Sequence, residues 1–151
     1  MKANARECAL QVLIACRKNN AWADAALKSA LKTNTLSAPD AALCSRIVYG
    51  VMQNRMLLDF YIGAYCTQKP DHLQPPLLEI LRIGAYQIIY LDKIPDSAAV
   101  NTSVELAKLA KREKLSVQTI WLKTCRSKMK MKTIRLNIIF LCLFRNHQSL
   151  T

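Results

Sequence analysis

Glycine is scarce in this sequence, and its scarcity excludes the common nucleotide-binding loops. The 151 residues include only three glycines, Gly50, Gly63 and Gly84, and no two of them are close together. A Rossmann GxGxxG turn or a P-loop needs clustered glycines, because its backbone must approach a phosphate closely. We therefore expect no dinucleotide, no nucleoside triphosphate and no other cofactor to bind to this chain.

Long apolar runs and metal-ligand pairs are also missing. The longest apolar run, Ile138–Phe144, has 7 residues, whereas a membrane-spanning helix needs roughly 20. None of the six cysteines lies in a CxxC pair, and His72 and His147 are isolated, so we expect free thiols and no metal site. The N-terminus does not have the pattern of a secretory signal, because Glu7 and Gln11 interrupt its apolar stretch. These features predict a cytoplasmic protein.

Acidic residues are few only in the last part of the chain. The formal net charge is +12, a value that would attract a polyanion such as nucleic acid or an anionic membrane surface. Residues 1–110 contain 12 Lys and Arg against 9 Asp and Glu, a net charge of +3. Residues 111–151 contain 10 against 1, a net charge of +9. Bulk charge therefore does not by itself make the first part of the chain a nucleic-acid-binding domain.

Apolar residues recur at helical spacing through most of the chain, without the alternation of a half-buried strand. The expected helices cover about residues 5–16, 21–31, 39–66, 75–91 and 97–112. Ser37 is the expected N-cap of the third helix, which is long or kinked, and Pro39 lies in its first turn. Pro95 ends the fourth helix, and Asp96 or Ser97 is the expected cap of the last. The pattern predicts an all-α domain in which the first two helices form a hairpin.

The sequence changes character after residue 112. Residues 113–151 mix β-branched runs with a Lys-Met-Lys-Met-Lys alternation, and they contain a single acidic residue. We interpret 1–112 as one domain and 113–151 as an atypical basic tail. If the tail lies on an anionic membrane, the chain would instead be a helical interaction module held at a membrane surface. We favour the first interpretation and expect no membrane partner.

Four segments of the expected helices resemble the NusB-like domain. They are Asn-Ala-Arg-Glu at 4–7, Ile-Val-Tyr-Gly at 47–50, the run from Leu81 to Pro95 (LRIGAYQIIYLDKIP), and Ala-Ala-Val-Asn at 98–101. Among NusB-like domains, these segments most resemble the domain at the N-terminus of the Sun family of bacterial 16S ribosomal RNA cytosine-C5 methyltransferases. The resemblance covers about residues 3–112. It implies an all-helical bundle that binds RNA, ribosomal RNA in this family, and not DNA.

The resemblance also implies what this chain lacks. Family members continue into a methyltransferase domain with an S-adenosylmethionine site and a catalytic cysteine in a Pro-Cys motif, whereas this sequence contains no Pro-Cys dipeptide. The family's next helix is also not found after Glu113, and a frameshift in the coding sequence is one explanation. We therefore expect a truncated, non-catalytic N-terminal part of such an enzyme. The alternative is a stand-alone antitermination factor that regulates transcription by binding RNA and a ribosomal protein.

Five basic residues are the candidates for RNA contact: Lys2, Arg6, Arg17, Arg82 and Lys108. Arg6 and Arg17 are eleven positions apart, so a helical step of about 100° places them on one side of the first helix, within roughly 20°. Together with Lys2 they would line a track for phosphates. The family's use of its N-terminal helix favours this function, and no residue is assigned a catalytic role.

We expect structural roles for three other residues of the Leu81–Pro95 segment, Gly84, Tyr86 and Gln87. Tyr86 can stack on an unpaired base and Gln87 can hydrogen-bond to one. A tyrosine on a buried helix is, however, more often part of the core, which is the interpretation we adopt. Gly84 lies within an otherwise bulky helix face, and its cost of about 1 kcal/mol relative to alanine predicts a close approach between helices.

Overall fold

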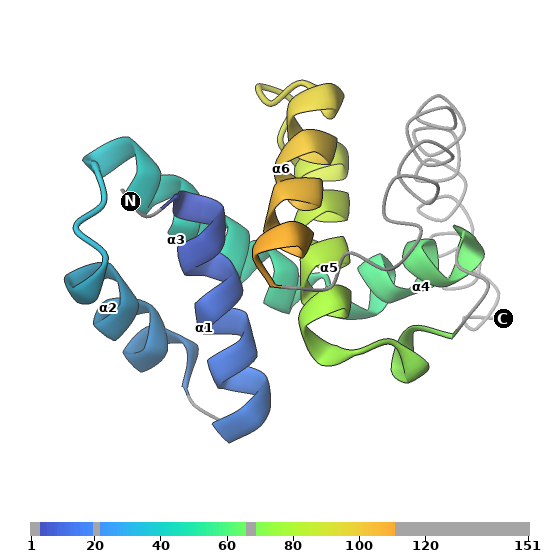
Figure 1. The fold of residues 1–151 in the computed structure, drawn as a ribbon, viewed down its shortest axis with the longest axis horizontal. Coiled ribbons are helices and arrows are strands. Elements are labelled where there is room, and N and C mark those ends of the chain that lie inside the picture. The colour runs from blue at the N-terminus through green and yellow to red at the C-terminus, as the bar shows by residue number, and fades with distance from the viewer. Residues whose placement is uncertain (1–3, 20–21, 66–68, 111–151) are drawn as a thin grey trace, which may run out of the picture.

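The protein is described by a computed structural model, which places residues 4–19, 22–65 and 69–110. Over these ranges the chain forms six α-helices, one 3₁₀ turn and no strand (Figure 1). The elements are α1 (Ala5–Asn19), α2 (Ala23–Thr33), α3 (Ala38–Gln53), α4 (Arg55–Tyr65), η1 (Pro70–His72), α5 (Pro75–Tyr90) and α6 (Asp96–Leu109). The predicted all-α class is confirmed. Lys2 and the tail 113–151 lie outside the described residues.

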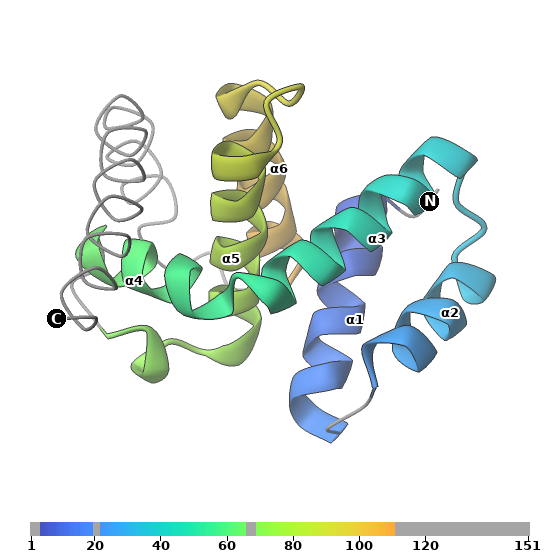
Figure 2. The same ribbon diagram turned by 180° about the vertical axis from the view of Figure 1, so that it is seen from behind.

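The third helix, which the sequence predicts to be long or kinked, consists of two helices, α3 and α4, which meet at Asn54. The Asn54 amide nitrogen Nδ2 donates to the carbonyl of Gly50 at 2.8 Å, and the Asn54 backbone N–H donates to the same carbonyl at 3.1 Å. A local side-chain bond of this kind competes with continuation of the helix. The hydroxyl of Tyr90 on α5 donates to Asn54 Oδ1 at 2.9 Å. The junction is therefore held by a third helix, and the chain changes direction there (Figure 2).

The two expected helix caps have different outcomes. Ser37 caps α3 as predicted, because its Oγ accepts from the backbone N–H of Asp40 at 3.3 Å and donates to Asp40 Oδ2 at 2.6 Å. The prediction for α6 is wrong. Pro95 is its N-cap residue, without a side-chain cap, and Asp96 is already the first helical residue. An acidic residue in the first turn is close to the positive end of the helix dipole, which stabilises the helix without a side-chain cap.

Helix α5 is the centre of the molecule. Eleven consecutive residues, Leu78–Ile88, are buried, and the helix packs against α1, α3, α4 and α6 (Figures 1 and 2). A helix that is covered on all sides must provide partners for its polar side chains. Glu79, Arg82 and Gln87 are the charged or amide side chains in this buried run. Their partners determine which residues of the other helices come together.

The first three helices pack beside this centre. Helices α1 and α2 lie side by side, as expected for a hairpin, and α3 crosses α1 on the way to α5 (Figures 1 and 2). Cys8 on α1 and Cys44 on α3 are buried free thiols, as predicted, and Cys16 is a partly exposed free thiol. None of the described helices is long and apolar enough to cross a membrane.

Tyr86 belongs to the core, as predicted, and it explains a glycine on α3. Its ring occupies the space that a Cβ atom on Gly50 would need, and it stacks on Tyr90 with ring centroids 5.1 Å apart. Only glycine allows α3 and α5 to approach this closely. Gly84 is also buried, and its predicted close approach remains a prediction.

Candidate functional site

Arg6 and Arg17 both extend from α1 toward α5. Arg6 Nε donates to the side-chain oxygen of Gln87 at 2.7 Å, and Arg17 Nη1 lies 3.5 Å from Glu79 Oε1. The two arginines therefore share one side of α1, as their spacing predicts, and that side faces the central helix. Gln87 is fully buried, which confirms a structural role and not a base-contacting one.

Arg6 lies at a partly buried seam between helices. Burial lowers the pKa of Arg6, and the nearby carboxylates of Asp40 and Glu105 oppose that shift. Glu105 belongs to α6, three residues before the exposed Lys108. Residues three apart on a helix lie on the same face, so Glu105 and Lys108 share one face of α6, which packs against α1. The predicted RNA contacts of Arg6, Lys108 and Lys2 remain predictions.

Arg82 is not on the surface. Its side chain is 4% exposed, its Nε and Nη2 donate to the two carboxylate oxygens of Asp59, and its Nη1 donates to Glu79. Burial alone would lower the pKa of Arg82, but the hydrogen bonds and charges of Asp59 and Glu79 outweigh it and raise that pKa. The guanidinium joins α5 to α4 and is not presented to a phosphate. The buried position of Arg82 therefore corrects our expectation that this residue contacts RNA.

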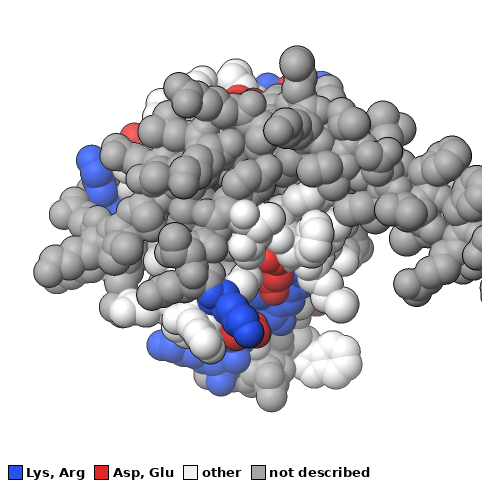
Figure 3. Space-filling view, turned by 90° about the vertical axis from the view of Figure 1, so that its right-hand side faces the viewer, with Lys and Arg blue, Asp and Glu red and all other residues white. Residues whose placement is uncertain are grey.

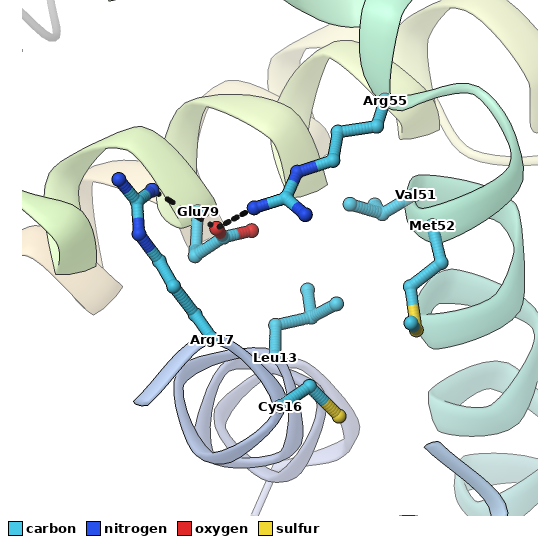
Figure 4. Close-up of a pocket in the computed structure, with 7 residues that line it drawn as sticks. All are labelled: Leu13, Cys16, Arg17, Val51, Met52, Arg55 and Glu79. Atoms are coloured by element: carbon cyan, nitrogen blue, oxygen red, sulfur yellow. Dashed lines mark ion pairs between the residues drawn. The ribbon is translucent and has the colours of Figure 1, made fainter. Parts of the chain in front are cut away.

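Glu79 is surrounded by three arginines. Its Oε1 accepts from Arg82 Nη1 at 2.6 Å and lies 3.5 Å from Arg17 Nη1 and 3.9 Å from Arg55 Nη2. Figure 4 shows Arg17 and Arg55 on opposite sides of the carboxylate. The Arg82 contact is a short charge-assisted hydrogen bond. The other two nitrogen–oxygen distances exceed the value of about 2.7–2.9 Å that is usual for hydrogen bonds between charged groups. Arg17 and Arg55 are therefore only loosely held.

A pocket of about 240 Å³ opens beside this cluster. Its walls come from four helices: Leu13, Cys16 and Arg17 of α1, Val51 and Met52 of α3, Arg55 of α4, and Glu79 of α5 (Figure 4). The charged groups form one wall and the apolar groups another. We call these seven residues the arginine pocket.

Arg55 was not among the residues predicted from the sequence to have a function. One signal was available, because Arg55 is the first residue of α4. A cation at a helix N-terminus is opposed by the helix dipole, so its presence there indicates some other stabilising or functional contact. Its partner Glu79 lies in a different helix and could not be identified from spacing.

The described part of the face in Figure 3 carries charges of both signs. In the part of the face in Figure 3 that is not grey, Lys and Arg side chains lie directly beside Asp and Glu side chains. Within the described ranges no group of three or more His, Cys, Asp or Glu side chains is placed to hold a metal ion. A function in binding would therefore depend on a few positioned cations.

Comparison with known proteins identifies the family. The model of the NusB family matches residues 3–117. This chain belongs to the NusB family. It is 39% identical over 108 residues to the probable ribosomal RNA small subunit methyltransferase B of Bacillus subtilis, covering 72% of this chain and 24% of that protein. It is 41% identical over 106 residues to the protein of the same name from Synechocystis, covering 70% and 24%.

The chain is also similar to transcription antitermination proteins, and these matches cover most of the relative's length. The NusB-family chain is 34% identical over 113 residues to the transcription antitermination protein NusB of Listeria monocytogenes, covering 74% of this chain and 84% of that protein. It thus spans about a quarter of the length of the methyltransferases and most of the antitermination protein. The predicted resemblance is confirmed, and the match to the methyltransferases leaves about three quarters of their length uncovered.

Proposed function

We propose that this NusB-family chain binds RNA as the non-catalytic N-terminal part of a ribosomal RNA cytosine-C5 methyltransferase in the bacterial cytoplasm. The proposal is supported by sequence identities of 39% and 41% to two ribosomal RNA methyltransferases, in matches that cover 24% of the length of each. The segment without a counterpart is where a methyltransferase domain would lie. The 151 residues would therefore provide the part of such an enzyme that binds ribosomal RNA.

The contacts with RNA would be made by a small number of cations. Arg6 lies on α1 and Lys108 is exposed on α6, which packs against α1, and Lys2 is three positions before Ala5 in the sequence. Arg17 is partly exposed at the arginine pocket. Each phosphate contact releases counterions from the RNA, so affinity would fall as salt concentration rises. Arg82 is left out of this set, because its charge neutralises Asp59 and Glu79 inside the fold.

Substitution of Arg6 tests the proposed RNA contact. We expect Arg6→Ala to weaken binding of a short unstructured oligoribonucleotide, measured by fluorescence anisotropy. The slope of log affinity against log salt should fall by about 0.7, the contribution of one single-strand phosphate contact. Lys28→Ala is the matched control, since Lys28 is an exposed cation on α2. An unchanged slope in a folded Arg6→Ala variant would remove Arg6 from the interface.

The second candidate is a stand-alone antitermination factor that binds RNA and a ribosomal protein. It is favoured by the 84% coverage of the Listeria protein. The nucleotide sequence that follows the coding region separates the two candidates. A methyltransferase reading frame directly downstream, in the same or a shifted frame, supports the enzyme part. Its absence supports the antitermination factor.

A further inference from the structure

We propose that the arginine pocket binds one unpaired nucleotide of the RNA, with its phosphate against the exposed faces of Arg17 and Arg55 and its base against the apolar wall. The inference rests on the proposed RNA binding and names the place on the fold where a nucleotide enters. It draws on the charge balance, on one unpartnered donor and on the two-sided lining of the pocket.

The cluster around the pocket carries excess positive charge. Arg82 contacts both Asp59 and Glu79, so it does not neutralise the two carboxylates completely. Arg17 and Arg55 add two positive charges where only one negative charge remains to be balanced. Both lie at least 3.5 Å from Glu79 Oε1, and the side chains are 30% and 50% exposed. The pocket therefore attracts an anion even though it contains a carboxylate.

One donor in the cluster has no hydrogen-bond partner in the described structure. Arg17 Nη1 is buried, and its distance of 3.5 Å to Glu79 gives an ion pair without a hydrogen bond. A buried donor left unpaired costs about 1–3 kcal/mol, and more when it is charged. Nearly all such groups in proteins have a partner. Because Glu79 lies between the two arginines and Nη1 is buried, the partly exposed Arg17 side chain would turn toward the pocket for this donor to reach a phosphate oxygen.

The opposite wall of the pocket suits the face of a base. Leu13, Val51 and Met52 line this wall, with Met52 exposed and the other two forming its buried floor (Figure 4). The volume of about 240 Å³ is several times the roughly 30 Å³ that one water molecule occupies in the liquid. A free phosphate would use only the charged wall, whereas a nucleotide uses both. This two-sided lining favours a nucleotide as the occupant.

Glu79 adds a preference among the bases. Its Oε1 is turned toward the arginines, and Figure 4 shows its second carboxylate oxygen directed toward the interior of the pocket. A carboxylate accepts a hydrogen bond from the exocyclic amino group of cytosine, whereas uracil presents a carbonyl oxygen at the same position. The pocket should therefore bind cytidine in preference to uridine.

Anisotropy titrations of the 151-residue chain with labelled oligocytidylate and oligouridylate test this proposal. We expect oligocytidylate to bind about tenfold more tightly. Arg17→Gln and Arg55→Gln should each weaken binding about tenfold and reduce the salt slope by about 0.7. Lys28→Gln on α2 is the matched control and should leave both nearly unchanged. Thermal unfolding of each variant shows whether it is folded, and the half-exposed Arg55 provides the variant least coupled to the core.

Alkylation of Cys16 provides a readout that does not depend on affinity. Cys16 lines the pocket, and burial raises the pKa of its thiol, so it reacts slowly but measurably at mildly alkaline pH. Oligocytidylate should slow this modification, followed by mass spectrometry. Oligouridylate at the same concentration is the control, because the pocket should bind it less tightly and protect Cys16 less.

Each outcome separates the pocket from the proposed function. RNA binding that is unaffected by both arginine substitutions, with Cys16 unprotected, would overturn the nucleotide pocket and leave RNA binding intact. Absence of RNA binding by the unmodified chain would overturn both. Protection of Cys16 by polyglutamate but not by RNA would assign the pocket to an acidic protein partner and overturn the proposal.

Discussion

Arg82 and Asp59 form a two-point ion pair that joins α5 to α4. Nε and Nη2 of the guanidinium donate to Oδ1 and Oδ2 of the carboxylate, each at 2.7 Å. The third nitrogen, Nη1, donates to Glu79 at 2.6 Å. The planar fork of arginine matches a carboxylate in this geometry, and a lysine ammonium cannot reproduce it. One buried cation therefore holds two carboxylates from two helices.

Removal of this cation should destabilise the fold strongly. Arg82→Ala would leave the buried Glu79 carboxylate and the partly buried Asp59 carboxylate without their main partner. Breaking a buried ion pair by removing one partner typically costs about 3–5 kcal/mol. We expect a loss of this order in the free energy of unfolding, measured by urea denaturation with far-UV circular dichroism. Arg82→Lys should lie between the alanine variant and the unmodified chain.

An exposed arginine provides the comparison. Arg46 lies on the surface of α3, and replacement of such a residue usually changes stability by about 0.5 kcal/mol or less. If Arg82→Ala and Arg46→Ala unfolded at the same urea concentration, the buried pair would contribute little to stability. Arg82 would then have no structural role that explains its burial.

The contact between Gly50 and Tyr86 makes a second prediction. In a helix, alanine is favoured over glycine by about 1 kcal/mol, so Gly50→Ala on an open helix face would stabilise the protein. Here the added methyl group would overlap the Tyr86 ring, which is buried and stacked on Tyr90. Overpacking of this kind costs about 1–3 kcal/mol or more. We expect a net decrease in melting temperature, measured by circular dichroism.

A double-mutant cycle identifies the cause of that decrease. Tyr86→Ala removes the ring that the new methyl group meets, so Gly50→Ala should destabilise the Tyr86→Ala background much less than the unmodified chain. An equal effect in both backgrounds would place the strain elsewhere on α3.

Local features of the fold could be predicted from the sequence. Apolar spacing gave the positions of the helices, and Ser37 with Pro39 gave the start of α3. A kink in the helix expected over residues 39–66 was one alternative, but its position at Asn54 was not predicted, because the apolar stripe continues through it. The break depends on a side-chain bond to Gly50 and on the hydroxyl of Tyr90, which is 36 residues away.

The candidate site was less predictable, because helical spacing tells which residues share a side and not what that side faces. Arg6 and Arg17 were correctly placed together, but Gln87 and Glu79 as their partners depend on how α1 packs against α5. Arg82 was expected to contact RNA because it is basic. Its burial follows from the position of α5 at the centre of the bundle, which is a property of the whole fold.

The Cys44 thiol predicts how stability changes at alkaline pH. Burial, followed by a hydrogen bond with Cys8, raises the pKa of Cys44 from the ordinary 9.0 to about 12. In the unfolded chain the thiol would lose its proton near pH 9.0, whereas the folded chain retains it until about pH 12. The unfolded state therefore binds fewer protons within this window, so the free energy of unfolding falls as pH rises through it. Below the window this contribution is fully present.

The Cys44→Ala variant isolates this contribution, because other groups titrate in the same range. Between pH 9.0 and about 12, the free energy of unfolding of the unmodified chain should fall more steeply with pH than that of the variant. The difference in slope should be at most about 1.4 kcal/mol per pH unit, the value for one proton. Urea denaturation of both chains at several pH values under reducing conditions measures the two slopes. The cavity in the variant lowers the free energy of unfolding by the same amount at every pH, so it does not change the slope. Equal slopes for the two chains would show that Cys44 titrates normally in the folded protein.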